Sequence, residues 1–381
     1  MRPVSIVGIG QIPVRKRHEK SIRQMGAEVV RLAMSDAEVD RVDALFNGNM
    51  LSDELQGQKH IASLIADEAG LHGIEALDVR AATGTGAAAL RMAYLAVASE
   101  EADLAVAVGV EKMSDGVPTP VIAKALDAEQ EVVNGDTLIS KNAELMRLYR
   151  EHFGAPKDAF VNFAVNAHKN AQNNPNALFK NKLVTAEEVL NSRMVSYPIR
   201  LFDSSPICDG AAAVVLAPTG EARAYTRESV RMLASSVATD RFRISDRDNP
   251  LFLEAAHVSA QKAFRRANVH RDDIDFFELH DAFSIMATML LEAVGYARPG
   301  EGWRLAAEME IALDGCIPIA TQGGLKARGH PIGATALYQA CEITLQLTGK
   351  AGVNQLDSPS VAMMQSVGGA GTTIITHIFG V

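Results

Sequence analysis

Apolar and polar residues follow a block pattern in the first part of the chain. Short apolar runs of strand length alternate with longer stretches in which apolar residues recur on one helical face. The clearest short run is Leu104–Val110, which lies between Asp103 and Glu111. This alternation predicts a mainly parallel sheet covered by helices on both faces. We expect strands at Val4–Gly8, Val42–Phe46 and Leu104–Val110, and helices at Gln24–Ser35, Gln58–Ala69 and Gly86–Ser99, while Leu77–Ala81 leads into the turn at AATGTGAAAL.

The alternation stops between residues 113 and 200. Asparagine, glutamine, histidine and lysine accumulate around NAHKNAQNNPNALFKNK, which has helical stretches but no alternating strands. Apolar side chains remain available for packing at Phe160, Phe163, Leu178 and Val184. These features predict a loop-rich insertion rather than a disordered segment. The apolar run Asp209–Pro218 then returns to a buried strand.

The second part of the chain repeats the first. Arg41–Met50 resembles Asp272–Phe283, TGTGAAAL aligns with HPIGATAL, and Leu104–Met113 resembles Val361–Gly371. Three similar segments in the same order indicate an internal duplication. We therefore expect two similar α/β halves with one insertion. The predicted domains are residues 1–112 with 201–222, the insertion 113–200, and residues 223–381.

The duplication brings two helix starts into equivalent positions. Thr83 precedes one helix and His330 precedes the other, with Gly86 aligned on Gly333. A helix N-terminus leaves backbone N–H groups unpaired and carries a partial positive charge. Two facing N-termini, related by a pseudo-twofold axis, would suit an anionic oxygen, as an oxyanion hole requires.

Composition limits the function classes. A chain of 381 residues with 48% apolar and 22% charged residues is typical of a soluble globular protein with two domain-sized units. No run approaches the roughly 20 apolar residues that span a bilayer, and MRPVSIVGIG is too short for a signal peptide. The net charge of −9 argues against a nucleic-acid partner.

The three cysteines, Cys208, Cys316 and Cys341, match neither a zinc pattern nor a CxxC motif. We interpret them as small buried apolar residues in a reducing compartment and expect a cytoplasmic protein. His280 and Asp281 are too few ligands to indicate a metal, so no metal site is predicted.

Six motifs together resemble the thiolase superfamily over nearly the whole chain. They are GVEKMS, NPNALFKNKLVTAEEVLNS, CDGAAAVVLA, ELHDAF, GGLKARGHPIGAT and SVGGAGT. The HDAF form resembles the sterol-carrier-protein and archaeal branch. The resemblance implies a five-layered α/β/α/β/α fold, a homodimer or tetramer, and activity on acyl-coenzyme A thioesters. Coenzyme A would be part of the substrate, with no tightly bound cofactor.

The resemblance also assigns site residues. The GHP histidine corresponds to His330, and the HDAF histidine, which helps to polarise a thioester oxygen in the family, corresponds to His280. The backbone N–H of Gly368 corresponds to an oxyanion donor, together with that of Thr83. The family binds coenzyme A through its insertion, where His168, Lys169, Lys180 and Lys182 are candidates. A solvated basic loop is the alternative for those four residues.

This chain lacks the cysteines of a thiolase. Thr83 stands at the position of the nucleophile, and Ser366 and Ala282 stand at the two positions used for the proton-shuttling cysteine. Thr83 could attack a thioester only with a base such as His330. We favour the alternative that it fills the cysteine's space and makes a hydrogen bond. Ser366 is a weak base, and a satisfied hydroxyl is the simpler interpretation.

Three functions remain open from the sequence. The first is carbon–carbon bond chemistry without a covalent intermediate, such as retro-aldol cleavage of a β-hydroxyacyl-CoA. The resemblance to thiolase-like lyases makes Tyr338 and Tyr296 further candidates. The second is a non-catalytic subunit that binds acyl-CoA or lipid, and the third is a thiolase that uses Thr83. Relatives in this branch work with an OB-fold partner of the DUF35 type, which is therefore a possible partner here.

Overall fold

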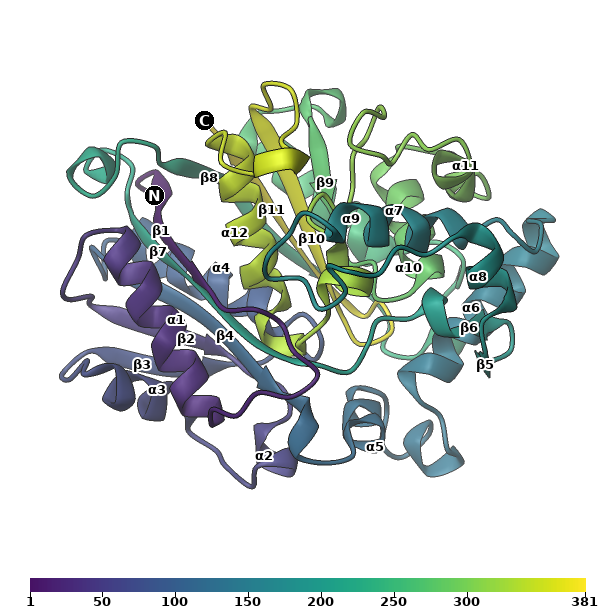
Figure 1. The fold of residues 1–381 in the computed structure, drawn as a ribbon, viewed down its shortest axis with the longest axis horizontal. Coiled ribbons are helices and arrows are strands. Elements are labelled where there is room, and N and C mark those ends of the chain that lie inside the picture. Colours follow the sequence, from purple (N-terminus) through teal and green to yellow (C-terminus); the bar gives the residue numbers. More distant parts are fainter.

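One nine-stranded sheet runs through the molecule in the computed structural model, which describes residues 1–381 (Figure 1). Its order is β3-β2-β4-β7-β1-β8-β11-β10-β9. The first five strands belong to the first half and the last four to the second, and the halves join where β1 pairs with β8 at Val4–Ile6. The strands are β1 Val4–Gln11, β2 Ala44–Gly48, β3 Glu75–Val79, β4 Ala105–Lys112, β7 Asp209–Pro218, β8 Val230–Thr239, β9 Phe276–Glu278, β10 Val361–Gly368 and β11 Thr373–Gly380.

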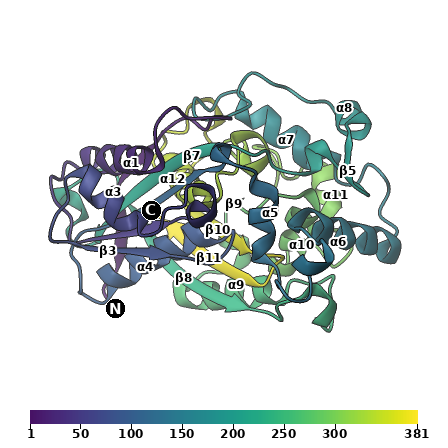
Figure 2. The same cartoon turned by 90° about the horizontal axis from the view of Figure 1, so that it is seen from below.

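Helices pack against the two halves of this sheet in three layers, one between the halves and one on each outer face (Figure 2). The helices α4 and α12 share one hydrophobic core with strands of both halves, and so they lie between them. A second core joins α1 and α3 to the first half, and a third joins α9 and α10 to the second. The predicted five-layered α/β fold is therefore confirmed. These helices are α1 Ile22–Asp36, α3 Ile61–Ala69, α4 Thr85–Ala98, α9 Glu254–Ala267, α10 Ser284–Val294 and α12 Thr335–Leu347.

The segment between β4 and β7 packs beside the second half (Figure 1). Tyr149, Phe160 and Phe163 are buried in the same core as Leu290 and Leu291 of α10. Aromatic side chains bury large apolar areas, so this segment is fixed to the second half rather than loosely attached. Its elements are α5 Pro118–Ile122, α6 Leu138–Phe153, α7 Val161–Ala171, α8 Ala186–Asn191 and the strands β5 Met194–Ser196 and β6 Ile199–Arg200. The remaining short helices are α2 Ser52–Leu55 and α11 Gly302–Ala307.

Local sequence explains where the helices begin and end. Ser21 and Gln24 form a reciprocal capping box at the start of α1. Thr137 and Ser140 do the same for α6, which ends at Gly154 in the left-handed conformation. Measured for length and apolar character, every helix falls short of what crossing a membrane requires.

Candidate active site

The two predicted helix starts touch at the centre of the molecule. A Cβ placed on Gly86 would lie 2.5 Å from the carbonyl oxygen of Gly333, and one placed on Gly109 would lie 2.2 Å from the same oxygen. Only glycine permits so close an approach of two backbones. The buried carboxylate of Glu111 then accepts the N–H groups of Met50 and Gly333 at 3.0 Å each, which ties the two halves together.

We expect Gly86→Ala to destabilise the protein by about 1–3 kcal/mol, because its methyl group would overlap a backbone atom that can move only with the helix start. The free energy of unfolding in urea measures this effect. Gly220→Ala is the matched control, since a Cβ there has no neighbour within 4 Å. Equal unfolding midpoints for the two variants would show that the contact between helix starts is not tight.

A cavity of about 170 Å³ opens at this junction. Thr83, His280 and His330 line it, so the structure brings together three residues that the sequence predicted for one site. Most of the other lining side chains are apolar. They include Ile122 and Leu138 from the insertion, Phe283 and Met286 from the start of α10, and Ile332 from the GHP turn.

The Thr83 hydroxyl is fully occupied by the backbone. It donates a hydrogen bond to the carbonyl oxygen of Val367 at 2.6 Å and accepts one from the N–H of Gly369 at 3.1 Å. A base that activates a hydroxyl must take its proton through a hydrogen bond. Because this proton is directed at a carbonyl rather than at His330, the geometry favours the structural role for Thr83.

The two histidines face each other at right angles. Their ring centroids are 5.1 Å apart. His330 precedes α12, and its Nδ1 lies 2.7 Å from Oγ1 of Thr335, which leaves Nε2 for the cavity. His280 follows β9, and its Nδ1 has no hydrogen-bond partner. The pair can therefore offer one nitrogen each to a bound molecule.

Burial keeps both imidazoles neutral. It lowers the pKa of His330 well below the ordinary histidine value, with further lowering by His280 and Arg328. Burial and then Arg328 lower the pKa of His280 to about 3. A neutral imidazole has one nitrogen that accepts a proton and one that donates a hydrogen bond. The site thus holds a base and a hydrogen-bond donor at neutral pH.

The SVGGAGT motif, at the end of β10, lies beside Thr83. Its residues do not all reach the cavity that the sequence predicted they would share. Gly368 packs against the first turn, where a Cβ on it would lie 2.5 Å from the carbonyl oxygen of Ala81. Gly369 lines the cavity, whereas Ser366 is 1% exposed and does not. Ser366 is therefore no base for a molecule in this cavity as it stands.

The tyrosines predicted as candidates lie away from the cavity. The Tyr338 hydroxyl donates to the carbonyl oxygen of Ile12 at 2.7 Å and accepts the N–H of Ala211 at 3.1 Å. Tyr296 packs near Phe277, and its hydroxyl is directed to the carbonyl oxygen of Arg271. Tyr338 is thus corrected from a catalytic candidate to a residue that fixes β7 and the residue after β1 on α12.

The four basic candidates of the insertion also lie outside the cavity lining. His168 is 2% exposed, stacks on Phe179 and bonds through Nδ1 to the carbonyl oxygen of Lys182. The Lys182 ammonium lies 4.9 Å from the Phe202 ring centroid. His168 is therefore a packing residue, while Lys169, Lys180 and Lys182 are exposed and remain free to meet a charged group at the surface.

Two residues near His330 were not predicted from the sequence. Thr335 holds the imidazole, and the thiol sulfur of Cys208 accepts the backbone N–H of His330 at 3.2 Å. Cys208 and Cys341 are buried as predicted, and burial raises the pKa of the Cys208 thiol to about 12. Cys316 is exposed, so the prediction that it is buried is wrong. Thr335 follows the GHP motif by a few residues and could have been found there, whereas Cys208 is remote in sequence and gives no signal.

Known proteins of one family resemble this chain over its whole length. Residues 4–220 match the family described as thiolase, N-terminal domain, and residues 236–381 match that described as thiolase C-terminal domain-like. A protein named acetyl-CoA acetyltransferase from Methanothermobacter thermautotrophicus is 42% identical over 382 residues, covering 100% of both chains. Sterol carrier protein 2 from Homo sapiens is 29% identical over 99% of this chain and 72% of its own.

Two solved structures share the fold. The structure titled "Ltp2-ChsH2(DUF35) aldolase" has a TM-score of 0.87 at 23% identity and covers 99% of this chain and 97% of that one. A monomeric SCP2-thiolase-like protein type 1 from Mycobacterium smegmatis has a TM-score of 0.77 at 17% identity, covering 99% and 76%. At these identities the likeness concerns the fold alone.

Proposed function

The chain belongs to the thiolase superfamily, and on that premise we propose that it acts on acyl-coenzyme A thioesters and breaks a carbon–carbon bond without a cysteine nucleophile. The reaction is retro-aldol cleavage of a β-hydroxyacyl-CoA. One observation carries the proposal: two imidazoles whose pKa burial lowers line the cavity, while the residue in the nucleophile's place, Thr83, directs its proton to the Val367 carbonyl.

The residues divide the reaction between them. His330 takes the proton of the β-hydroxyl, the bond between the α and β carbons breaks, and the β carbon becomes a ketone or aldehyde. The electron pair moves into the thioester as an enolate. His280 and the backbone N–H of Thr83 stabilise the enolate oxygen. The protonated His330 then returns its proton to the α carbon, which gives a shorter acyl-CoA.

The size of the cavity indicates a short acyl group. Its volume of about 170 Å³ is close to the ~150 Å³ of a cavity that holds benzene. The apolar walls formed by Ile122, Leu138, Phe283 and Met286 offer few partners for a polar chain. Coenzyme A would enter as the carrier group of the acyl-CoA substrate, not as a resident cofactor.

A direct assay tests the reaction. A short β-hydroxyacyl-CoA should yield a ketone or aldehyde together with the shorter acyl-CoA. Liquid chromatography with mass spectrometry detects both products. Acetoacetyl-CoA with free coenzyme A is the matched thiolysis assay. Absence of both activities with retained binding of coenzyme A would favour a non-catalytic subunit that binds acyl-CoA or lipid. Thiolysis by the wild type would favour Thr83 as acyl acceptor.

The proposed base predicts how activity depends on pH. His330 must be unprotonated to act, and its pKa lies well below the ordinary histidine value because it is buried beside His280 and Arg328. Activity therefore falls only as the pH drops through that lowered pKa. We expect kcat/KM for cleavage to stay flat from pH 7 to below about 6.5, the reference value for histidine. An acidic limb centred at or above that value would contradict the assignment.

We also propose a homodimer and a partner protein, as expected for a member of the thiolase superfamily. β3 lies at the edge of the sheet and pairs only with β2, and its Leu77 is 50% exposed. An edge strand presents unpaired backbone groups to another chain, so we place a homodimer contact there. Light scattering on the purified protein measures the mass, and a monomer would refute this assembly. The complex named in the aldolase structure motivates a DUF35-type partner, tested by co-purification.

We also propose a cytoplasmic location. Cys208, Cys316 and Cys341 are all free thiols, which fits a reducing compartment. Mass spectrometry of the protein isolated from its cell and denatured in the presence of an alkylating agent would test this, since three alkylated cysteines are expected.

A further inference from the structure

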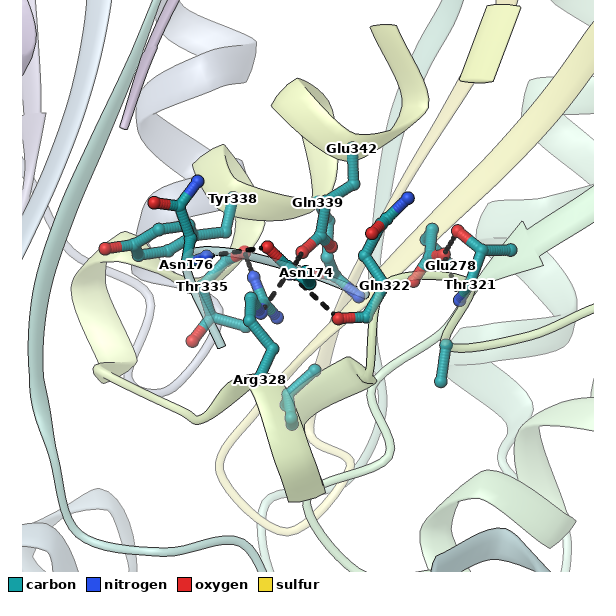
Figure 3. A network of polar contacts seen from close by, with 12 residues as sticks. Asn174, Asn176, Glu278, Thr321, Gln322, Arg328, Thr335, Tyr338, Gln339 and Glu342 are labelled. Atoms are coloured by element: carbon teal, nitrogen blue, oxygen red, sulfur yellow. Dashed lines mark hydrogen bonds and ion pairs between the residues drawn. The ribbon is translucent and has the colours of Figure 1, made fainter. Parts of the chain in front are cut away.

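A fully buried arginine stands two residues before His330 in the chain. Arg328 is 0% exposed and ends the π-helical turn Gly324–Arg328, shortly before His330. Its Nε lies 3.5 Å from Oε1 of Glu342 on α12, and its guanidinium lies 5.1 Å from the centroid of the Tyr338 ring. Figure 3 shows the guanidinium among these residues. Burying a charge this deeply is costly, so its position calls for a functional explanation.

Arg328 is joined to His330 through one residue. Its Nη1 donates a long hydrogen bond of 3.4 Å to the carbonyl oxygen of Thr335, the first residue of α12. The hydroxyl of the same Thr335 lies 2.7 Å from Nδ1 of His330. We propose that Arg328 is a positioning residue for His330, because it fixes Thr335 and Thr335 fixes the imidazole.

The hydroxyl of Thr335 also sets which nitrogen of His330 is the base. It lies 3.4 Å from the carbonyl oxygen of Pro331 and can donate to it. When it does so, the hydroxyl accepts the Nδ1–H of His330, and Nε2 is left as the free acceptor in the cavity. A fixed Thr335 therefore selects the tautomer that the proposed reaction needs.

The guanidinium acts on the imidazole through its charge as well. The groups that face His330 are Arg328, the His280 ring and the Cys208 thiol. Only Arg328 is a permanent cation among them. Its Nε makes an ion pair with the Glu342 carboxyl at 3.5 Å, and its Nη2 has no hydrogen-bond partner. A nearby cation disfavours a protonated imidazole, so Arg328 adds to the lowering of the pKa of His330 that burial and then His280 produce.

Glu342 moderates this charge. Burial raises the pKa of Glu342 to about 8, Arg328 opposes the rise, and Glu278 and Asp281 add to it. Below that pH the carboxyl group is mostly protonated and Arg328 keeps its full charge beside the histidines. Above it the carboxylate offsets the guanidinium. The charges of Arg328 and Glu342 together thus set the electrostatic potential at the His330 imidazole.

Titration of His330 by imidazole NMR tests the charge effect. In Arg328→Met we expect the pKa of His330 to rise toward the reference value of about 6.5, whereas Arg328→Lys keeps it low because the charge remains. Arg298→Met, which removes an exposed arginine outside this cluster, is the control. An unchanged His330 titration in Arg328→Met would overturn the inference.

A second variant covers the case in which Arg328→Met fails to fold. In the wild type, the His330 resonances should show a further inflection near pH 8, where Glu342 titrates. The near-isosteric Glu342→Gln should abolish that inflection. If it persists, it belongs to Lys326, whose pKa burial lowers to about 8, and the role given to Glu342 is wrong.

Kinetics separates positioning from general stability. Arg328→Lys should lower kcat by about 10²-fold with KM unchanged, because a displaced base misses its near-attack geometry. An unchanged kcat would overturn the positioning role. This readout rests on the proposed function, but the NMR titrations need no substrate. Failure of the reaction and failure of the inference are therefore distinguishable.

Discussion

Replacing His330 with alanine is expected to lower kcat/KM for β-hydroxyacyl-CoA cleavage by about 10²–10⁴-fold, the usual contribution of a positioned general base. The variant loses the group that takes the hydroxyl proton, and His280 does not replace it because its role is to donate a hydrogen bond to the enolate oxygen. The surrounding cavity stays intact, since the Thr83, Val367 and Gly369 contacts do not involve the imidazole. Steady-state kinetics gives the loss.

The control for this experiment is His72→Ala. His72 is a histidine on the surface, with 72% of its side chain exposed, and its removal should leave turnover unchanged. Calorimetric titration with coenzyme A should give the same affinity for wild type and His330→Ala. Turnover by His330→Ala within a few-fold of wild type would exclude the imidazole as the base.

The pattern of apolar residues predicted the first half of the fold well. The predicted strand Asp209–Pro218 matches β7, and the helix predicted at Gly86–Ser99 differs from α4 by one residue at each end. These elements are long and uniformly apolar on the buried side, so local pattern alone specifies them. In the second half, β8 and β11 were not predicted. In β8 several positions are only partly buried, and its run of buried residues does not alternate regularly.

The paired site was predictable because the duplication is visible in the sequence. Aligning Gly86 with Gly333 implied that the two helix starts are equivalent, and the structure shows the backbones in contact there. The resemblance then supplied His280 and His330. What it could not supply is the direction of each side chain. Whether Thr83 faces a histidine or a carbonyl, and whether Tyr338 faces the cavity or Ile12, depends on packing between residues far apart in sequence.

The same limit applies to the buried charges. Arg328, Glu342 and Glu278 lie on three different elements, and nothing in their spacing shows that they meet in one apolar core. A charged residue in a sequence is usually exposed. Only the structure reveals that these three are each at most 1% exposed and that the charge of one of them, Arg328, acts on His330.

Introducing a cysteine at Thr83 should create the nucleophile that this chain lacks. We expect Thr83→Cys to raise thiolysis of acetoacetyl-CoA above the wild-type background by about 10²-fold, because a thiol beside a helix N-terminus and a neutral imidazole becomes a thiolate far more readily than a hydroxyl ionises. The N–H of Gly369, which now bonds to the threonine oxygen, would face the sulfur and stabilise its charge. His330 lines the same cavity and can accept the proton.

The gain should stop short of a full thiolase rate, because Ser366 and Ala282 still occupy the places of the second cysteine. Intact-mass spectrometry should therefore show an acetyl adduct that accumulates on Thr83→Cys and is absent from the wild type. Thr83→Ser is the matched control, since it keeps a hydroxyl and removes only the methyl group that hinders attack. An adduct on Thr83→Ser or on the wild type would mean that the hydroxyl itself is a nucleophile. The hydrogen bond to Val367 would then have to open during turnover, and retro-aldol chemistry would lose its main support.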